Sequence, residues 1–274
     1  MNQRKQAKRA WMDVLAGYRE KQIKSAKAKP IIEKWRDLHD HGQVKIVNDM
    51  LDIQGGEIFL DCGCGSGRVL TQFEDKCLTI GIDISAYYCH AAKKAAPHSL
   101  IIQGDIENLP LKDESIDVCV MIYTFVYAPD KKKTMEEIYR VLKKDGKLII
   151  FDPNYLSLRT FLRKLQVVKH KLSKKEDSPK DIGRLLVTTQ CLSFFAFRKL
   201  ACEVGFECNS WRGNFETIPF PMITEGGLSK ITLLLFWLWE KLGCKKWGKL
   251  PLIRYFSDFL IIKLVKREER KTRN

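Results

Sequence analysis

The sequence has no Cys-x-x-Cys pair, and its five histidines are scattered along 274 residues. Structural zinc sites use cysteine and histidine ligands at short, regular spacings. His39 and His41 are two residues apart, which puts their rings on opposite sides of a strand or splays them on a helix. We therefore predict no metal site.

The nine cysteines show no pattern that would indicate disulfide pairing. Their number is odd, and they are spread over the chain. The basic stretch Met1–Arg9 is not followed by the apolar segment of a secretory signal. These features predict reduced thiols and a cytoplasmic location.

A long hydrophobic run is also missing. The longest apolar stretch is Ile231–Trp239, nine residues that include one threonine. Because crossing a bilayer takes roughly 20 residues, we expect no transmembrane helix here. Lys230 and Lys241 flank this stretch, so it is either an interfacial segment that dips into lipid headgroups or a buried helix that packs on the domain.

Positive charge is concentrated at the two ends of the chain. Residues 1–36 hold 11 basic and 3 acidic residues, a net charge of +8, and residues 241–274 hold the same numbers. With a total of +15, residues 37–240 have a net charge of −1. The cationic ends suggest an anionic partner: a membrane surface, a nucleic acid or an acidic glycan. Solvated helix faces are the alternative.

The most informative stretch is a glycine-rich turn after a short apolar run. Residues 58–60 predict a buried strand that ends at Asp61, and glycines follow at Gly63, Gly65 and Gly67. From Arg68 a helix-like segment runs to residue 73. Strand, glycine turn and helix start make the first half of a βαβ unit. The dinucleotide fingerprint G-x-G-x-x-G/A is absent, because Arg68 occupies its third small position.

Strands and helices then alternate along the chain, which predicts an α/β fold with a doubly wound, mostly parallel seven-stranded sheet. Further strands are expected at 77–82, 99–103, 116–123, 147–151, 206–211 and 259–265, and helices at 85–97, 132–142 and 192–204. We expect a basic helical arm over 1–36, one domain over 37–266 with cap insertions at about 155–190 and 215–257, and a basic tail over 267–274.

Acidic residues stand where successive strands end. In an open parallel sheet the ligand binds at the carboxyl ends of the strands. Asp83 is placed to accept hydrogen bonds from ribose hydroxyls, and Asp105 with Ile106 suits an adenine amino group and ring. Tyr123 ends the fourth strand. Carboxylates in this number favour a nucleoside that carries a cationic group and no phosphate, whereas a pyrophosphate prefers a helix N-terminus.

These motifs resemble those of the class I S-adenosylmethionine (SAM) methyltransferases. The resemblance is carried by 61–67, 81–85, 104–110, 113–118 and 137–148. It covers about 45–153 and is nearest to the ubiquinone/menaquinone-methyltransferase-like (methyltransferase type 11) family. It implies SAM as cofactor, S-adenosylhomocysteine as product, and a binding set of Asp61, Gly63, Cys64, Gly65, Gly67, Asp83, Ile84, Asp105, Ile106 and Tyr123.

The methyl acceptor is left open by the sequence. Many relatives have histidines after strand four, where this chain has Tyr123–Tyr127, and the Asn/Asp-Pro-Pro-Tyr/Phe and Pro-Cys motifs of N- and C5-methyltransferases are absent. Tyr123, His39 and His41 are the candidate general bases. We expect a small-molecule, lipid, quinone or glycan-precursor acceptor. An RNA methyltransferase and a non-catalytic SAM-binding module are the alternatives.

Overall fold

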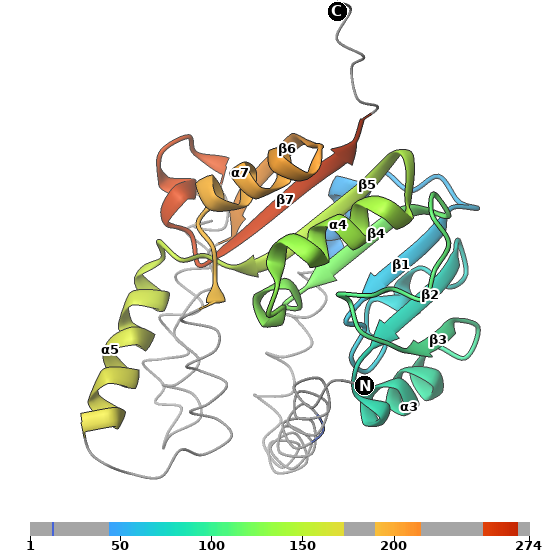
Figure 1. Cartoon of the computed structure of the whole chain (residues 1–274), viewed down its shortest axis with the longest axis horizontal. Coiled ribbons are helices and arrows are strands. Elements are labelled where there is room, and N and C mark those ends of the chain that lie inside the picture. The colour runs from blue at the N-terminus through green and yellow to red at the C-terminus, as the bar shows by residue number, and fades with distance from the viewer. Residues whose placement is uncertain (1–12, 14–43, 173–189, 215–248, 268–274) are drawn as a thin grey trace, which may run out of the picture.

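The computed structural model describes residues 13, 44–172, 190–214 and 249–267. Within them one sheet of seven strands runs in the order β3-β2-β1-β4-β5-β7-β6 (Figure 1). The strands are β1 Ile58–Cys62, β2 Leu78–Asp83, β3 Leu100–Gln103, β4 Ile116–Ile122, β5 Leu142–Pro153, β6 Phe206–Asn214 and β7 Phe259–Lys266. The first five are parallel, and β7 pairs antiparallel with β5 and β6. The predicted doubly wound sheet is confirmed.

The strand order reverses between β1 and β4. From β1 the chain moves outward through β2 to β3, then returns to place β4 on the other side of β1. The carboxyl ends of β1 and β4 therefore flank the point where an open α/β sheet opens a crevice for a ligand. The glycine turn follows β1 at this point.

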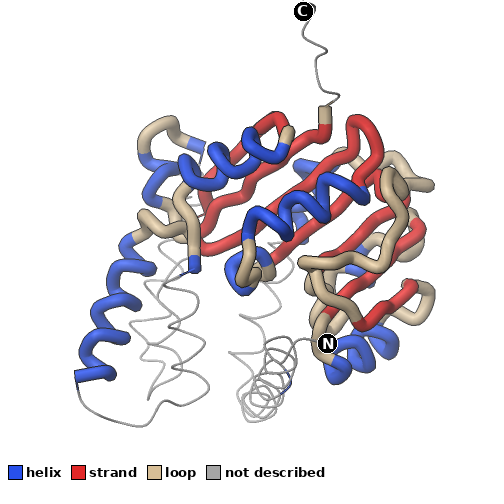
Figure 2. Tube along the Cα trace, viewed as in Figure 1, coloured by secondary structure: helices blue, strands red, loops and turns tan. Residues whose placement is uncertain are grey.

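Helices cover both faces of the sheet, as the tube in Figure 2 shows. On one face lie α4 (Lys131–Val141) and α7 (Phe194–Val204), whose apolar residues join the main core cluster. On the other face a helix over 44–51 packs with Phe59 and Phe73 in a second cluster. The helix α3 (Ala86–Ala95) packs against the glycine turn in a third.

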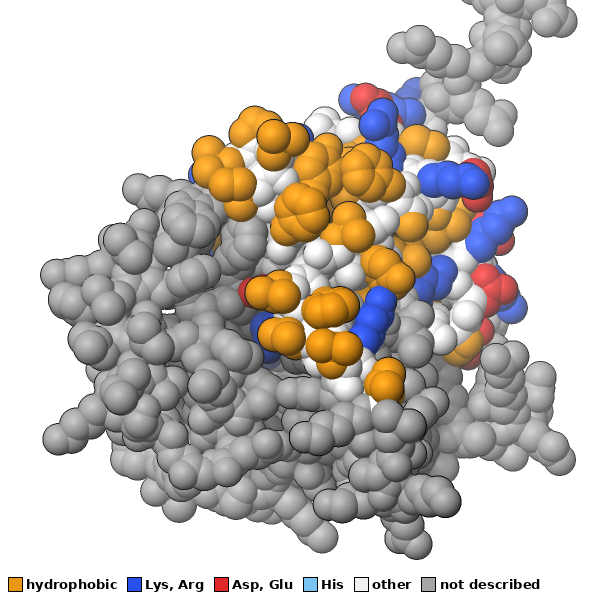
Figure 3. Space-filling model, turned by 90° about the vertical axis from the view of Figure 1, so that its left-hand side faces the viewer, with side chains coloured by type: hydrophobic (Ala, Val, Ile, Leu, Met, Phe, Trp, Pro, Cys, Tyr) orange, Lys and Arg blue, Asp and Glu red, His pale blue; other side chains and the backbone are white. Residues whose placement is uncertain are grey.

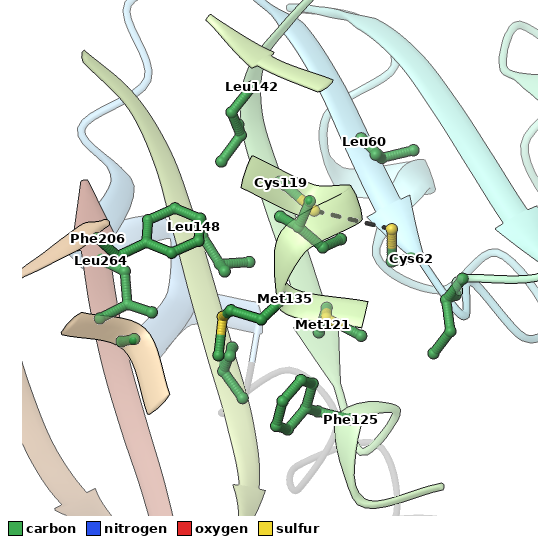
Figure 4. Close-up of a cluster of buried hydrophobic side chains, with 14 of the residues drawn as sticks. Leu60, Cys62, Cys119, Met121, Phe125, Met135, Leu142, Leu148, Phe206 and Leu264 are labelled. Atoms are coloured by element: carbon green, nitrogen blue, oxygen red, sulfur yellow. Dashed lines mark hydrogen bonds between the residues drawn. The ribbon is translucent and has the colours of Figure 1, made fainter. Parts of the chain in front are cut away.

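The main core joins side chains from β1, β4, β5 and the two helices α4 and α7. Figure 4 shows Cys62 on β1 and Cys119 on β4 with their sulfurs facing each other, 3.8 Å apart and fully buried. Both are free thiols. A small, polarisable side chain fills the narrow space between paired strands without a hydrogen-bonding demand.

Local signals set the helix ends. Ser85 caps α3 by accepting a hydrogen bond from the Tyr88 amide, and Gly205 ends α7 with φ 107°, the left-handed conformation that glycine adopts without strain. The predicted helix after the glycine turn was wrong: η1 (Leu70–Gln72) is a single 3₁₀ turn. Only ten residues separate Gly67 from β2, which begins at Leu78, so a longer helix does not fit.

After β5 the chain turns into α5 (Leu158–Leu172), which stands apart from the sheet (Figure 1). Buried Asn154 holds this turn in place, because its side-chain amide donates to the carbonyls of Tyr255 and Ser257. Both carbonyls lie in or next to η4 (Ile253–Phe256), the 3₁₀ turn before β7. None of the helices in the described ranges is long and apolar enough to span a membrane.

Candidate functional site

The glycine turn is fixed to the neighbouring strands. The amides of Gly63 and Cys64 both donate to the Ile82 carbonyl, at 2.6 and 3.1 Å, which anchors the turn to β2. A Cβ on Gly63 would overlap the side chain of Thr124, at the end of β4. Glycine is required here because the turn and the β4 end approach each other too closely for a side chain.

Gly65 is different, because its missing side chain leaves open space. Its φ is 52°, and a Cβ built on it would meet no atom of the described residues within 4 Å. The Gly67 position, in contrast, is closed by Ala92 of α3. The side chain of Cys64 packs inward with Leu70 and Ala92, so this residue offers its backbone to the open side. The turn thus presents bare backbone around Gly65, the surface a flat or extended ligand needs.

Asp83, the last residue of β2, lies beneath this turn and is 6% exposed. One carboxyl oxygen accepts from the Gly65 amide at 3.0 Å and the other from the Ser85 amide at 2.9 Å. Burial raises the pKa of this carboxyl, and the amide hydrogen bonds, which include one from Ile84, oppose that shift. Each oxygen has a second lone pair, so Asp83 can still accept from ligand hydroxyls.

The Ser85 hydroxyl also donates to the carboxylate of Asp13. Asp13 is the one residue of the predicted basic arm that the structure describes. Its charge adds to the rise in the pKa of Asp83. Asp13, from the start of the sequence, therefore lies at the same edge of the sheet as the glycine turn.

Asp61 is a strongly perturbed carboxyl of this edge. It is 2% exposed, and its Oδ2 has no hydrogen-bond partner among the described residues. Burial raises the pKa of Asp61 to about 7; Asp83 adds to the rise and Arg68 opposes it. Unsatisfied buried carboxyl oxygens are costly and mark sites that wait for a ligand.

The end of β3 adjoins that of β2. The Gly104 amide donates to the Asp83 carbonyl at 2.9 Å. Asp105 Oδ1 accepts from the Glu107 amide at 3.1 Å, which fixes its half-buried carboxyl at the strand end. Ile106 is 8% exposed and packs in the main core. The structure thus brings Asp83 and Asp105 to one edge, as predicted from their positions.

Tyr123 follows β4 with an unusual backbone conformation. Its φ is 55°, a left-handed value that costs a non-glycine residue energy and is concentrated at functional sites. Its amide donates to the Phe151 carbonyl, and its ring packs against Phe151 and Phe259. The other two candidate bases, His39 and His41, lie outside the described residues.

Two residues of this edge were missed in the sequence. Thr124 covers Gly63 and donates to its carbonyl at 3.4 Å, and nothing in its sequence context marks it. Asp152 follows the apolar run at the end of β5, as Asp61 follows that of β1. It is 1% exposed, and its Oδ1 has no partner in the part of the chain described. Burial raises its pKa well above the usual range, while the Lys131 charge and the Val126 amide oppose this.

The described residues contain no cluster of three or more His, Cys, Asp or Glu side chains that could hold a metal ion. The donor set is instead made of carboxylates, backbone amides and a bare glycine backbone. It fits a cationic nucleoside: Asp61 offers an unpaired buried oxygen, Asp83 has spare acceptor capacity, and the space over Gly65 is open.

The strand order, the glycine turn and the acidic strand ends define a Rossmann-like methyltransferase fold. Residues 60–150 match the family model described as a methyltransferase domain.

Curated relatives match part of the chain. An uncharacterised protein of Methanocaldococcus jannaschii is 36% identical over 42% of this chain and 52% of its own length. A demethylmenaquinone methyltransferase of Paenarthrobacter aurescens is 28% identical over 49% and 56%. A sterol 4-C-methyltransferase of Caenorhabditis elegans is 29% identical over 44% and 36%. The chain thus spans about a third to a little over half the length of these relatives.

Solved structures agree on the fold. A SAM-dependent methyltransferase of Methanosarcina mazei superposes with a TM-score of 0.56 at 17% identity, over 81% of this chain and 97% of that one. Geranyl diphosphate C-methyltransferase of Streptomyces coelicolor, solved with S-adenosylhomocysteine, gives 0.53 at 12% identity, over 82% and 77%. Identities this low show the fold alone.

Proposed function

We propose that this protein is a SAM-dependent methyltransferase that acts on a small, largely apolar acceptor. The observation that carries the proposal is the buried Asp61 carboxyl, whose Oδ2 has no hydrogen-bond partner among the described residues, close to the glycine turn at Gly65. The family match over residues 60–150 supports it. A cytoplasmic location, expected from the unpaired cysteines, is part of the proposal.

In this proposal the glycine turn and the acidic strand ends bind the cofactor. Gly63, Gly65 and Gly67 let the backbone lie against it, with Cys64 contributing its main chain. Asp61 balances the positive charge of its amino acid portion. Asp83 accepts from the ribose hydroxyls with Ile84 beside it. Asp105 and Ile106 hold the adenine, and Tyr123 closes the site at β4.

The bound cofactor supplies an electrophilic methyl group, so the protein mainly has to align the acceptor. Well-oriented reactants gain roughly 7–11 kcal/mol from alignment alone. Asp152 is next to Tyr123 on the neighbouring strand end, since Ile122 pairs with Phe151. We propose that Asp152 accepts a hydrogen bond or a proton from a hydroxyl acceptor. Burial raises the pKa of the Asp152 carboxyl, which makes its ionised form a stronger base.

The acceptor class is proposed from two supports. The curated relatives include methyltransferases named for demethylmenaquinone and for sterols. In this chain, the segment that follows β5 has exposed apolar side chains, among them Tyr155, Leu156 and Leu158. We propose a quinone-like or lipid-linked acceptor, and an anionic membrane surface as the place where it is met.

The binding step is tested by isothermal titration with SAM and S-adenosylhomocysteine. Asp83→Asn removes a charged hydrogen-bond acceptor, which contributes about 1.5–3 kcal/mol, so affinity should fall about ten- to hundredfold. Asp75→Asn is the matched control, because Asp75 is an exposed aspartate in the turn before β2. If wild-type protein does not bind SAM, or if Asp83→Asn binds it as well as the control does, the proposal is wrong.

A further inference from the structure

The helix α5 presents apolar side chains to the outside. Leu158 is 67% exposed, Phe161 56%, Leu165 51% and Val168 55%. Their spacing of three or four residues places them on one side of the helix. A helix on the surface of a soluble domain normally shows the reverse pattern, with its apolar side against the protein.

The side of α5 that faces the protein holds half-buried Val167 together with polar and charged residues. Thr160 is 2% exposed, and its hydroxyl donates to the Asn154 carbonyl at 2.7 Å. The Lys164 ammonium lies 3.5 Å from the centre of the Tyr155 ring. The Arg159 guanidinium lies over the ring of Phe259. Polar and charged side chains of α5 thus contact the domain, and the apolar side chains named above are exposed in the part of the chain that the structure describes.

The apolar surface continues onto η4. Leu252 is 78% exposed and Phe256 61%, and Asn154 joins the start of α5 to this turn. Figure 3, which looks onto the α5 side of the molecule, shows hydrophobic side chains gathered there with few acidic ones. We call this surface the α5–η4 face, and its main residues are Leu158, Phe161, Leu165, Val168, Leu252 and Phe256.

Charge indicates which partner covers this face. The α5 sequence holds five Lys or Arg residues and no Asp or Glu, and Arg254 lies within η4. An apolar helix side bordered by cations is the signature of a helix that lies in the headgroup layer of an anionic bilayer. A nucleic acid would need cations rather than leucine and phenylalanine at the centre of the contact.

We propose that the α5–η4 face is an interfacial docking surface for an anionic lipid bilayer. The apolar side chains enter the boundary between headgroups and acyl chains, and the positive charge of the α5 sequence favours anionic headgroups. The proposal does not depend on methyl transfer, since lipid binding and SAM binding are measured separately on the same protein.

The test is flotation of the full chain with phosphatidylcholine vesicles that contain or lack phosphatidylserine. Leu165→Asp should lower the bound fraction about tenfold or more, because it removes apolar burial and adds like charge. Leu100→Asp is the matched control: Leu100 is 54% exposed, against 51% for Leu165, but lies on the opposite edge of the sheet. Leu252→Asp tests the η4 part independently, and thermal melting confirms that each variant folds.

The expected result is binding of wild-type and Leu100→Asp to phosphatidylserine vesicles, weaker at high salt, and its loss in Leu165→Asp and Leu252→Asp. Equal binding of Leu165→Asp and wild type would assign lipid binding to the cationic chain ends and overturn the proposal. So would a wild-type protein that ignores the vesicles, or one whose α5–η4 face pairs two copies in light scattering. Unchanged SAM affinity in Leu165→Asp separates this outcome from the fate of the proposed function.

Discussion

SAM binding should depend on pH through Asp61. In the ligand-free protein burial raises the pKa of this carboxyl to about 7. The ligand brings positive charge, so it favours the ionised form. If only that form binds, the association constant is proportional to the ionised fraction, and it should be about tenfold higher at about pH 8 than at about pH 6.

Isothermal titration at several pH values measures this dependence. The amino group of SAM itself titrates near these values, so Asp61→Asn is measured beside wild type. The association constant of wild type is divided by that of Asp61→Asn at each pH. This ratio cancels the titration of the ligand and of other groups that both proteins share, such as Asp83. We expect this ratio to fall about tenfold between about pH 8 and about pH 6. A ratio that does not change with pH would refute the assignment of Asp61 to the charged part of the ligand.

Three further predictions concern the same edge of the sheet. Gly65→Ala should lower SAM affinity at least about tenfold, because the added methyl group enters the space of the ligand. Gly56→Ala is the control, since Gly56 also has a positive φ and an added Cβ would meet no described atom within 4 Å. Both substitutions should lower the free energy of unfolding by about 1–2 kcal/mol, but Gly56→Ala should leave SAM affinity unchanged. Without ligand, Asp61→Asn should raise the free energy of unfolding by up to about 4 kcal/mol above about pH 7 and by little below about pH 4. The reason is that the buried carboxyl is ionised, and destabilises the folded state, only when the pH exceeds its raised pKa. Chemical denaturation at several pH values measures this gain, and a gain that is larger in acid would contradict the prediction. Asp152→Asn should keep SAM affinity and lower methyl transfer to an active lipid fraction about a hundredfold or more, and full activity would remove Asp152 from the acceptor site.

The parallel part of the fold was predictable because its signals are local. Strands alternate with helices, the glycine turn follows β1, and Ser85 and Gly205 set helix ends by their own side chains or backbone. The bounds of β5 were less predictable. Its pairing begins at Leu142, five residues before the predicted start, because the Asp145 turn is an irregularity within the strand and does not end it.

The positions of the acidic residues at the strand ends were predicted, but their hydrogen-bond partners were not. A sequence shows that an aspartate follows a strand, and parallel strands bring such residues together. It does not show that one carboxyl oxygen of Asp61 and one of Asp152 lack a hydrogen-bond partner among the described residues, because that depends on how neighbouring strand ends fill the space. The sequence also did not show which side of α5 faces outward, for a related reason. Its apolar spacing is that of an ordinary amphipathic helix, and only the contacts of Thr160 and Lys164 reveal which side faces the domain.

The Asn154 amide has a mechanical consequence. Four residues separate β5, which ends at Pro153, from Leu158 at the start of α5, and Asn154 ties this short connection to the carbonyls of Tyr255 and Ser257. The anchored residue, Asn154, lies two positions after Asp152. These hydrogen bonds therefore fix the start of α5, and with it the α5–η4 face, relative to the strand end where the acceptor is proposed to react.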